Sequence, residues 1–227
     1  MGWAIFAAAA VLIGVALYLR YFFKKKRQRE LTRIGGAFGL GFSPEDRFDL
    51  LSLPFALFHR GDGRGCENVL AGTWNGMDVK ELDYWYYEES SDSGGRSTRN
   101  YHRFSCAVTE IPAACPHLRL THESLFTRVG GYLGFQDIEL ESEEFNREYR
   151  VTCSDPKFAS DILDPLLMEW LIKQERWCLE VSDRYVLCYR KRLPPREVPA
   201  LLHALDGFRT RIPRVVWELY PSSPPGR

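Results

Sequence analysis

The sequence predicts an α+β protein, in which an N-terminal transmembrane helix precedes one domain with a mainly antiparallel sheet and two or three packed amphipathic helices. Three observations support this class. A charge-free apolar run opens the chain, short β-rich segments separated by turn residues fill its centre, and a strongly amphipathic helical pattern closes it. The 227 residues are 45% hydrophobic and 26% charged, which excludes a disordered or collagen-like chain.

A membrane anchor is predicted over residues 1–23. Residues 3–19 contain no charge, and Trp3 and Phe23 mark the ends of the span. A helix over these 21 residues would be about 31 Å long, which matches the roughly 30 Å hydrocarbon core of a bilayer. A cleaved signal peptide is the alternative, but it requires basic residues before the apolar core, where only Met1 and Gly2 precede Trp3.

A basic segment follows over residues 24–33. Its basic collar consists of Lys24, Lys25, Lys26, Arg27 and Arg29. Short flanking segments rich in lysine and arginine stay on the cytoplasmic side, so we expect a single-pass protein of the cell membrane with a cytoplasmic domain. The collar can also bind anionic lipid head groups, or it can serve only to stop translocation.

The rest of the chain has the opposite charge. Residues 1–33 carry seven Lys/Arg and one Glu, a net charge of +6, which leaves −6 for residues 34–227. A nucleic-acid-binding domain is expected to be basic, so no nucleic-acid partner is predicted. The six cysteines include no Cys-x-x-Cys pair and are expected to be reduced thiols. If the topology were inverted, they could instead form three disulfides.

The domain is expected over residues 34–220, with a helix over 31–38 leading out of the membrane and a disordered tail at 221–227. Asn75-Gly76 favours a type I′ turn, which predicts a hairpin with Trp74 opposite Met77 and Val69 opposite Leu82. Strands over 101–108 and 117–121 would extend it to a meander of about four strands. The polar segment 88–99, between the hairpin and the strand over 101–108, is predicted to be a mobile loop.

Helices and strands alternate in the second half. We expect a short helix over 125–133, strands over 137–141 and 148–153, and a second hairpin with strands over 177–181 and 185–189. Asp155-Pro156 and Asp164-Pro165 each place an N-cap before a proline, so they predict two abutting helices. The closing helix has one apolar face, formed by Val198, Leu201, Leu202, Leu205, Phe208 and Ile212.

Catalytic motifs are not evident. Cys115 lies two residues from His117, but side chains at that spacing on a strand share a face without necessarily touching. Asp137, Glu139 and Glu141 would share a strand face, and a solvated outer face explains them better than a cation site does. No catalytic, cofactor-binding or metal-binding residue is therefore assigned, and no cofactor is expected.

A run of four aromatic residues, from Tyr84 to Tyr87, is the candidate interaction surface. Alternation along a strand turns Tyr84 and Tyr86 to one face and Trp85 and Tyr87 to the other. The first pair is expected to be core, because it continues the pairing of the hairpin. Trp85 and Tyr87 are therefore predicted to be exposed and to bind a partner segment, although a covering loop or helix is the alternative.

Three parts of the sequence form a distinctive pattern: residues 137–170, the earlier residues Gly72, Gly76, Val79, Asp83, Tyr84 and Tyr86, and the later residues Phe208, Ile212 and Pro213. This pattern resembles a family of uncharacterised bacterial membrane-anchored proteins with one N-terminal span and a soluble domain of unknown function. The similarity covers most of positions 30–216. It implies the same architecture and carries over no catalytic or binding residue.

These observations favour a non-catalytic, membrane-tethered cytoplasmic domain whose partners are the lipid bilayer, its anionic head groups and a further protein. Two alternatives remain open. One is a membrane-associated enzyme whose site is assembled from distant strands, and the other is an extracytoplasmic domain with inverted topology.

Overall fold

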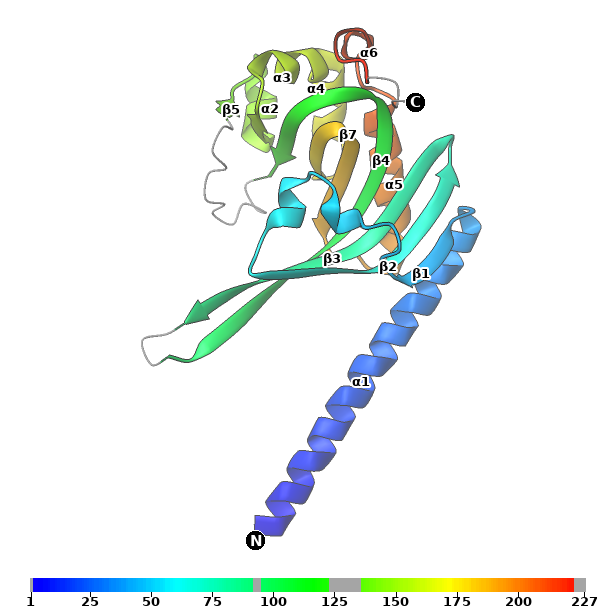
Figure 1. Ribbon diagram of the computed structural model, residues 1–227, viewed down its shortest axis with the longest axis vertical. Coiled ribbons are helices and arrows are strands. Elements are labelled where there is room, and N and C mark those ends of the chain that lie inside the picture. Colours follow the sequence, from blue (N-terminus) through cyan, green and yellow to red (C-terminus); the bar gives the residue numbers. More distant parts are fainter. Residues whose placement is uncertain (1, 92–94, 123–135, 223–227) are drawn as a thin grey trace.

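The computed structural model describes residues 2–91, 95–122 and 136–222 (Figure 1). Helix α1 (Gly2–Ala37) leads into a domain built on a seven-stranded antiparallel sheet. The strand order is β1-β2-β3-β4-β6-β5, and β7 pairs with β4. The α+β class predicted from the sequence is confirmed.

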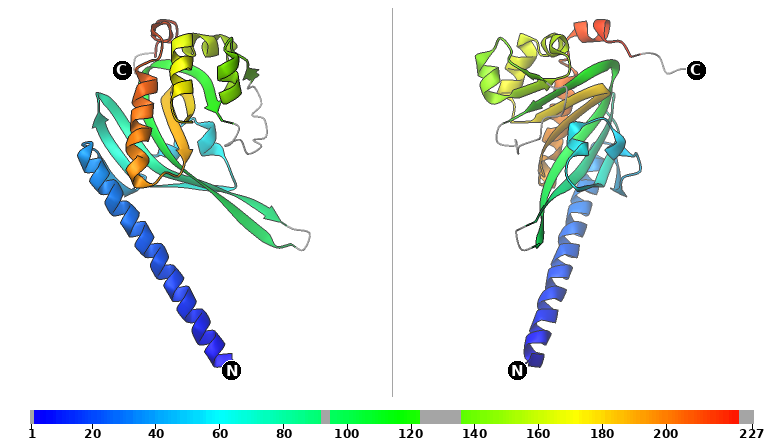
Figure 2. Two further views of the ribbon diagram at one scale, coloured as in Figure 1. Left: turned by 180° about the vertical axis from the view of Figure 1, so that it is seen from behind. Right: turned by 60° about the vertical axis from the view of Figure 1, so that its left-hand side comes forward.

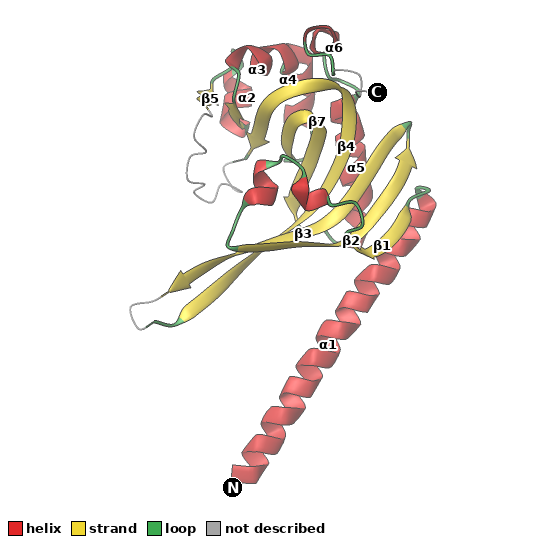
Figure 3. Cartoon of the chain, viewed as in Figure 1, coloured by secondary structure: helices red, strands yellow, loops and turns green. Residues whose placement is uncertain are grey.

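Figure 3 shows these elements by type. The strands are β1 (Gly41–Glu45), β2 (Gly63–Trp74), β3 (Met77–Ser91), β4 (Ser97–Thr121), β5 (Gln136–Ile138), β6 (Arg150–Cys153) and β7 (Cys178–Lys191). The later helices are α2 (Glu143–Glu148), α3 (Pro156–Ile162), α4 (Pro165–Lys173), α5 (Val198–Arg209) and α6 (Arg214–Leu219). Short 3-10 helices lie at η1 (Leu50–Ser52), η2 (Ala56–His59) and η4 (Pro195–Glu197).

Helix α1 runs without a break from the apolar N-terminal segment into the domain (Figure 1). Its segment Phe6–Ala37 is long and apolar enough to cross a membrane, with a mean hydropathy of 1.9 in its most apolar window, which is not buried by the rest of the chain. The helix expected over 31–38 is therefore the last part of α1 and not a separate element. No linker separates the apolar segment from the domain.

The hairpin of β2 and β3 has the predicted turn. Asn75 and Gly76 have φ angles of 49° and 69°, as a type I′ turn requires, and Trp74 pairs with Met77. The predicted register continues from there to Leu70 opposite Glu81, and Val69, predicted to lie opposite Leu82, falls in the irregularity that follows. Asn68, with a φ of 57°, forms a bulge that shifts the register by one residue, so that Glu67 pairs with Asp83.

Strands β3 and β4 form a hairpin that is longer than the sequence suggested. The loop expected over 88–99 is largely strand, because Glu88 pairs with Asn100 and Ser91 with Ser97. The two strands expected over 101–108 and 117–121 are one continuous strand, β4. Figure 2 shows that the free end of this hairpin and the N-terminal part of α1 extend from the same side of the domain.

The second predicted hairpin is also wrong, because β7 is a single strand that pairs along β4, from Phe104 opposite Lys191 to Leu120 opposite Leu179. Asp183 has a φ of 51° and lies where the register with β4 shifts. The polar segment 182–184 therefore forms a bulge that bends the strand instead of reversing it.

The predicted helix starts are confirmed. The side chain of Asp155 accepts a hydrogen bond from the Lys157 amide at 2.9 Å, and that of Asp164 accepts one from the Leu167 amide at 2.7 Å. Strands β5 and β6 are shorter than expected. The helix expected over 125–133 and residues 223–227 of the expected tail lie outside the described residues, whereas Pro221 forms a β-bridge with Ala113.

Apolar side chains form one core on each face of the sheet. On one face, α3, α4, α5 and the C-terminal part of α1 contribute residues that include Phe158, Leu205 and Leu31. On the opposite face, η1 and η2 cover a smaller core around Phe58 and Tyr84. Residues Val198, Leu201, Leu202, Leu205 and Phe208 of α5 are buried as predicted, and Ile212 is buried just beyond the helix.

Candidate membrane-proximal site

Helix α1 is attached to the sheet by an ion pair between Arg27 and Asp83. The Nε and Nη2 atoms of Arg27 donate to the two carboxylate oxygens of Asp83, each at 2.6 Å, and Nη1 donates to the Leu193 carbonyl at 2.8 Å. The two side chains are 12% and 4% exposed. This two-bond geometry fixes the angle as well as the position of the helix on the sheet.

Three further polar side chains complete this network. Arg192 Nη2 donates to Asp83 at 3.1 Å, and Asn68 Nδ2 donates to the same carboxylate oxygen at 2.9 Å. Gln28 of α1 donates to the Asn68 side-chain oxygen at 3.3 Å. The bulge at Asn68 thus positions an amide that contacts both α1 and Asp83.

Glu81 lies beside this network and is fully buried. Neither of its carboxylate oxygens has a hydrogen-bond partner among the described residues. Burial, and then the charge of Asp83, raises the pKa of Glu81 well above its ordinary value. Burial in this position therefore favours the protonated form of the Glu81 carboxyl over the ionised form.

Other contacts extend the attachment along α1. Lys24 Nζ lies 3.1 Å from a carboxylate oxygen of Glu67 on β2, and Leu31 is fully buried. A Cβ atom at Gly35 would lie 2.7 Å from Leu70 Cδ2, so the helix backbone packs directly on the sheet. The attachment therefore begins one residue after Phe23, the predicted end of the span.

A cavity of about 570 Å³ lies where α1 leaves the domain. Five cations line it, together with one acid and two apolar residues; they are Arg20, Lys24, Arg27, Arg103 and Arg192, with Glu67, Phe23 and Leu193. Sequence reasoning missed Arg103 and Arg192 here, because only the fold brings β4 and the end of β7 to the basic segment. Five basic groups at one concave surface favour an anionic ligand.

An aromatic strip continues from this cavity along the β3–β4 hairpin. Trp85, Tyr87 and Tyr101 pack on one another, with ring centroids 5.4–6.4 Å apart. A Cβ atom at Gly65 would lie 2.5 Å from the Trp85 ring, so the strip requires a glycine on the neighbouring strand. Arg103, which lines the cavity, pairs directly with Trp85 across the strands.

The four-aromatic run alternates between the two faces of the sheet. Tyr84 and Tyr86 are buried, at 1% and 0% exposure, and the Tyr84 hydroxyl donates to the Leu57 carbonyl at 2.9 Å. Trp85 and Tyr87 lie on the other face and are half-buried. Much of the area of this pair is covered by β2, and the remainder faces solvent.

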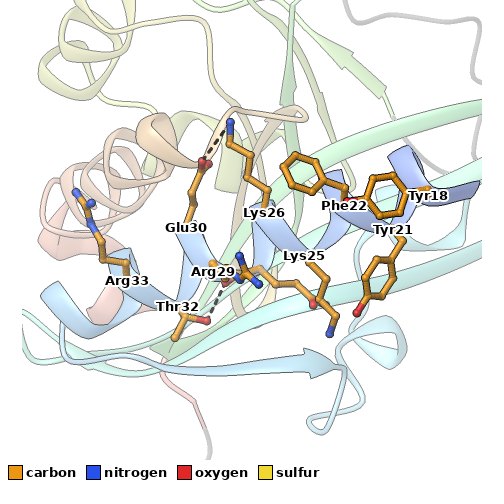
Figure 4. A pocket seen from close by; sticks show the side chains of 10 residues that line it. Tyr18, Tyr21, Phe22, Lys25, Lys26, Arg29, Glu30, Thr32 and Arg33 are labelled. Atoms are coloured by element: carbon orange, nitrogen blue, oxygen red, sulfur yellow. Dashed lines mark hydrogen bonds and ion pairs between the residues drawn. The ribbon is translucent and has the colours of Figure 1, made fainter. Parts of the chain in front are cut away.

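The opposite side of α1 carries the rest of the basic collar (Figure 4). Its side chains form an open groove with an aromatic end and a basic end: Tyr18, Tyr21 and Phe22, followed by Lys25, Lys26, Arg29 and Arg33. Lys26 lies 4.0 Å from Glu30. The basic collar thus lies on two faces of α1. Lys24 and Arg27 face the domain, where Arg27 forms a buried ion pair, and Lys25, Lys26 and Arg29 line the groove on the other face.

The structure does not bring the cysteine and histidine considered for catalysis, Cys115 and His117, into a catalytic arrangement. Burial raises the pKa of Cys115 to about 12, which disfavours a nucleophilic thiolate. The His117 imidazole lies 3.6 Å from Glu180, whose carboxylate accepts hydrogen bonds from the amides of Ala56 and Leu57. That carboxylate therefore caps the start of η2.

The acidic segment does not form the expected strand face. Strand β5 ends at Ile138, so Glu139 and Glu141 lie beyond it, and Asp137 forms an ion pair with Arg150. Within 2–91, 95–122 and 136–222, no group of three potential metal ligands occurs.

Comparisons with known proteins give one informative result. No family model matches the chain, and no curated protein matches its sequence. Its fold is similar to the crystal structure of the mycobacterial trehalose monomycolate transport factor A, TtfA, with a TM-score of 0.64 and 13% identity over 87% of this chain and 98% of that chain. At this identity the similarity shows the fold alone. An N-terminal apolar helix agrees with the membrane-anchored family that the sequence resembles, but no family match supports that resemblance.

Proposed function

We propose that this chain is a single-pass membrane protein whose cytoplasmic domain binds a protein or lipid partner at the inner leaflet and has no catalytic role. In this proposal residues 1–23 form the anchor, 24–33 the basic segment and 34–220 the domain. The observation that carries it is the continuity of α1, whose buried Arg27–Asp83 pair fixes an apolar helix rigidly to the sheet.

The short distance between the span and the attachment supports this function. Arg27 follows Phe23 by four residues, or about 6 Å along a helix. A domain held this closely cannot move far from the bilayer. The cavity around Arg20 and the free end of the β3–β4 hairpin would then both face the lipid surface.

The aromatic strip supports partner binding near that surface. Tryptophan and tyrosine are enriched at membrane interfaces and among the side chains that dominate protein–protein affinity. Trp85 and Tyr87 retain an exposed edge, and the neighbouring Tyr101 is 48% exposed. We propose that this strip is where a partner docks.

The cytoplasmic orientation is supported by the basic collar and by the cysteines. Lys25, Lys26 and Arg29 are exposed beside the apolar segment, as the positive-inside rule requires. All six cysteines are free, which suits a reducing compartment.

The structural neighbour suggests a general class of role. Its title describes a transport factor for trehalose monomycolate. For this chain we propose only the broader class, a non-enzymatic factor that serves a process at a membrane. A substrate or partner is not carried over from a relative of 13% identity.

Topology is tested by fusing a reporter after Arg227 that is active only in the cytoplasm. Activity is expected. A reporter that is active only outside the cytoplasm would overturn the proposed orientation and support the extracytoplasmic alternative.

Partner binding is tested by placing a photo-crosslinking amino acid at Trp85 in cells. A discrete cross-linked species is expected there. The matched control is Leu166, which is 75% exposed on α4, at the end of the domain opposite the hairpin (Figure 1). Equal cross-linking at both positions would contradict a specific surface at the aromatic strip.

A further inference from the structure

We propose that the cavity between α1, β4 and the end of β7 binds the phosphate-bearing head group of an anionic phospholipid from the leaflet that α1 leaves. This inference rests on the proposed function, in which α1 spans the membrane. It goes beyond the basic collar, because two of the cations it uses, Arg103 and Arg192, belong to the domain.

The charge balance of the cavity favours an anion. Its five cations share two carboxylates, since Arg27 and Arg192 both contact Asp83 and Lys24 contacts Glu67. Three positive charges therefore remain unbalanced. Among the described residues, no carboxylate lies within ion-pair distance of Arg20 or Arg103.

One donor of a residue that lines the cavity also lacks an acceptor. The Nε atom of Arg192 is buried and has no hydrogen-bond partner among the described atoms, although Nη2 of the same side chain contacts Asp83. A buried guanidinium N–H without an acceptor is costly, so a turn of the Arg192 side chain toward a phosphate bound in the cavity would gain a charge-assisted hydrogen bond.

The position of the cavity favours a lipid over a free phosphate. Arg20 and Phe23 belong to the last turns of the predicted span, and Leu19 beside them is 45% exposed. A head group bound by Arg20 and Arg103 would leave its acyl chains beside the apolar surface of α1. Phe23 and Leu193 supply the apolar walls that such a ligand would contact.

The test compares two double variants that remove the same charge from opposite sides of α1. Arg20→Gln with Arg103→Gln alters the cavity, and both side chains are exposed, so the fold should be retained. Lys25→Gln with Arg29→Gln is the matched control on the outer face shown in Figure 4. Equal thermal unfolding midpoints of both variants and the wild type would verify that folding is unaffected.

Lipid binding is measured by native mass spectrometry of the full chain in neutral detergent, titrated with phosphatidylglycerol. The cavity variant is expected to bind about 30-fold more weakly, from about a fivefold change for each of the two basic residues, and the control to stay within about threefold. Equal loss in both variants, or no loss in the cavity variant, would overturn the site. Binding of phosphatidylcholine equal to that of phosphatidylglycerol would also overturn it.

A second titration distinguishes the lipid from a soluble anion. If sodium phosphate at millimolar concentration displaced phosphatidylglycerol, a free phosphate would be the ligand and the lipid assignment would be wrong. Failure of the proposed function would give a different result. If alkaline carbonate extracted the wild-type chain from membranes, α1 would not span the bilayer. Retention in the membrane without selective binding would overturn only the cavity.

Discussion

Arg27 and Asp83 are 56 positions apart in the sequence, yet they form two parallel hydrogen bonds of 2.6 Å in the part of the molecule where α1 meets β3. The pair joins the predicted membrane helix to the centre of the sheet. A force or tilt applied to the span is therefore transmitted to the domain without an intervening linker.

The first prediction concerns this pair. Asp83→Ala should lower the free energy of unfolding by about 3–5 kcal/mol, because it leaves the largely buried Arg27 without a counter-charge. The measurement is denaturant unfolding of the detergent-solubilised chain, followed by tryptophan fluorescence.

Two controls separate charge burial from loss of volume. Glu218→Ala removes an exposed partner of Arg214 and should change stability by less than about 0.5 kcal/mol. The double variant Arg27→Met with Asp83→Leu should recover part of the lost stability, since it removes the uncompensated Arg27 charge, while Arg192 and Asn68 still lose their acceptor. A double variant as unstable as Asp83→Ala would contradict this account.

Two adjacent glycines in α1 give the second prediction. Gly35→Ala should destabilise the chain by roughly 1–3 kcal/mol, because its Cβ would lie 2.7 Å from Leu70 Cδ2 and 2.9 Å from the Leu40 carbonyl oxygen. Gly36→Ala meets no atom within 4 Å and should stabilise the helix by about 0.5 kcal/mol. Thermal unfolding of the two variants checks the difference. The same sign of effect at both positions would mean that α1 does not pack on the sheet as described.

The third prediction compares neighbouring aromatic residues on opposite faces of β3. Trp85→Ala should cost roughly 1–2 kcal/mol, since the ring is half-buried, whereas Tyr84→Ala should cost about 3–5 kcal/mol because its ring is in the core. Denaturant unfolding of both variants measures this difference. A loss at Trp85 as large as that at Tyr84 would make Trp85 a core residue and remove the case for a docking strip.

The fourth prediction concerns the pH dependence that Glu81 causes. Burial raises its pKa in the folded chain above the ordinary value of 4.5. Between these two values the folded state holds a proton that the unfolded state releases, so this group lowers stability as the pH rises through that window. Glu81→Gln has no proton to release, and its stability relative to the wild type should therefore increase with pH.

Unfolding midpoints at several pH values between 5 and about 8 measure this effect. Glu218→Gln, at an exposed position, should give a curve parallel to that of the wild type. Parallel curves for Glu81→Gln as well would show that folding does not raise the pKa of Glu81.

The sequence determined those features whose physical cause is local. The Asn75-Gly76 turn, the caps at Asp155 and Asp164 and the apolar face of α5 depend on residues within one or two turns of each other. The two faces of the aromatic run follow from strand alternation alone, so the side of the sheet on which Trp85 lies could be predicted without the fold. That the ring is half-buried there depends on its neighbours on other strands.

Tertiary structure decided the features that depend on distant partners. Segment 182–184 resembles a turn by composition, but pairing with β4 along its whole length makes it a bulge within β7. Likewise, the polar residues around Glu88 form strand because Asn100 and its neighbours pair with them. Backbone hydrogen bonds to another strand outweigh the weak local preference of such segments.

The candidate site shows the same division. Arg27 cannot be distinguished from Arg29 by residue type, because only the fold turns one toward Asp83 and the other toward solvent. The sequence determined that a basic segment follows an apolar helix, since that requires only composition. Which cations are buried, paired or unbalanced was decided by the sheet, because desolvation and ion pairing depend on groups that are close in space and far apart along the chain.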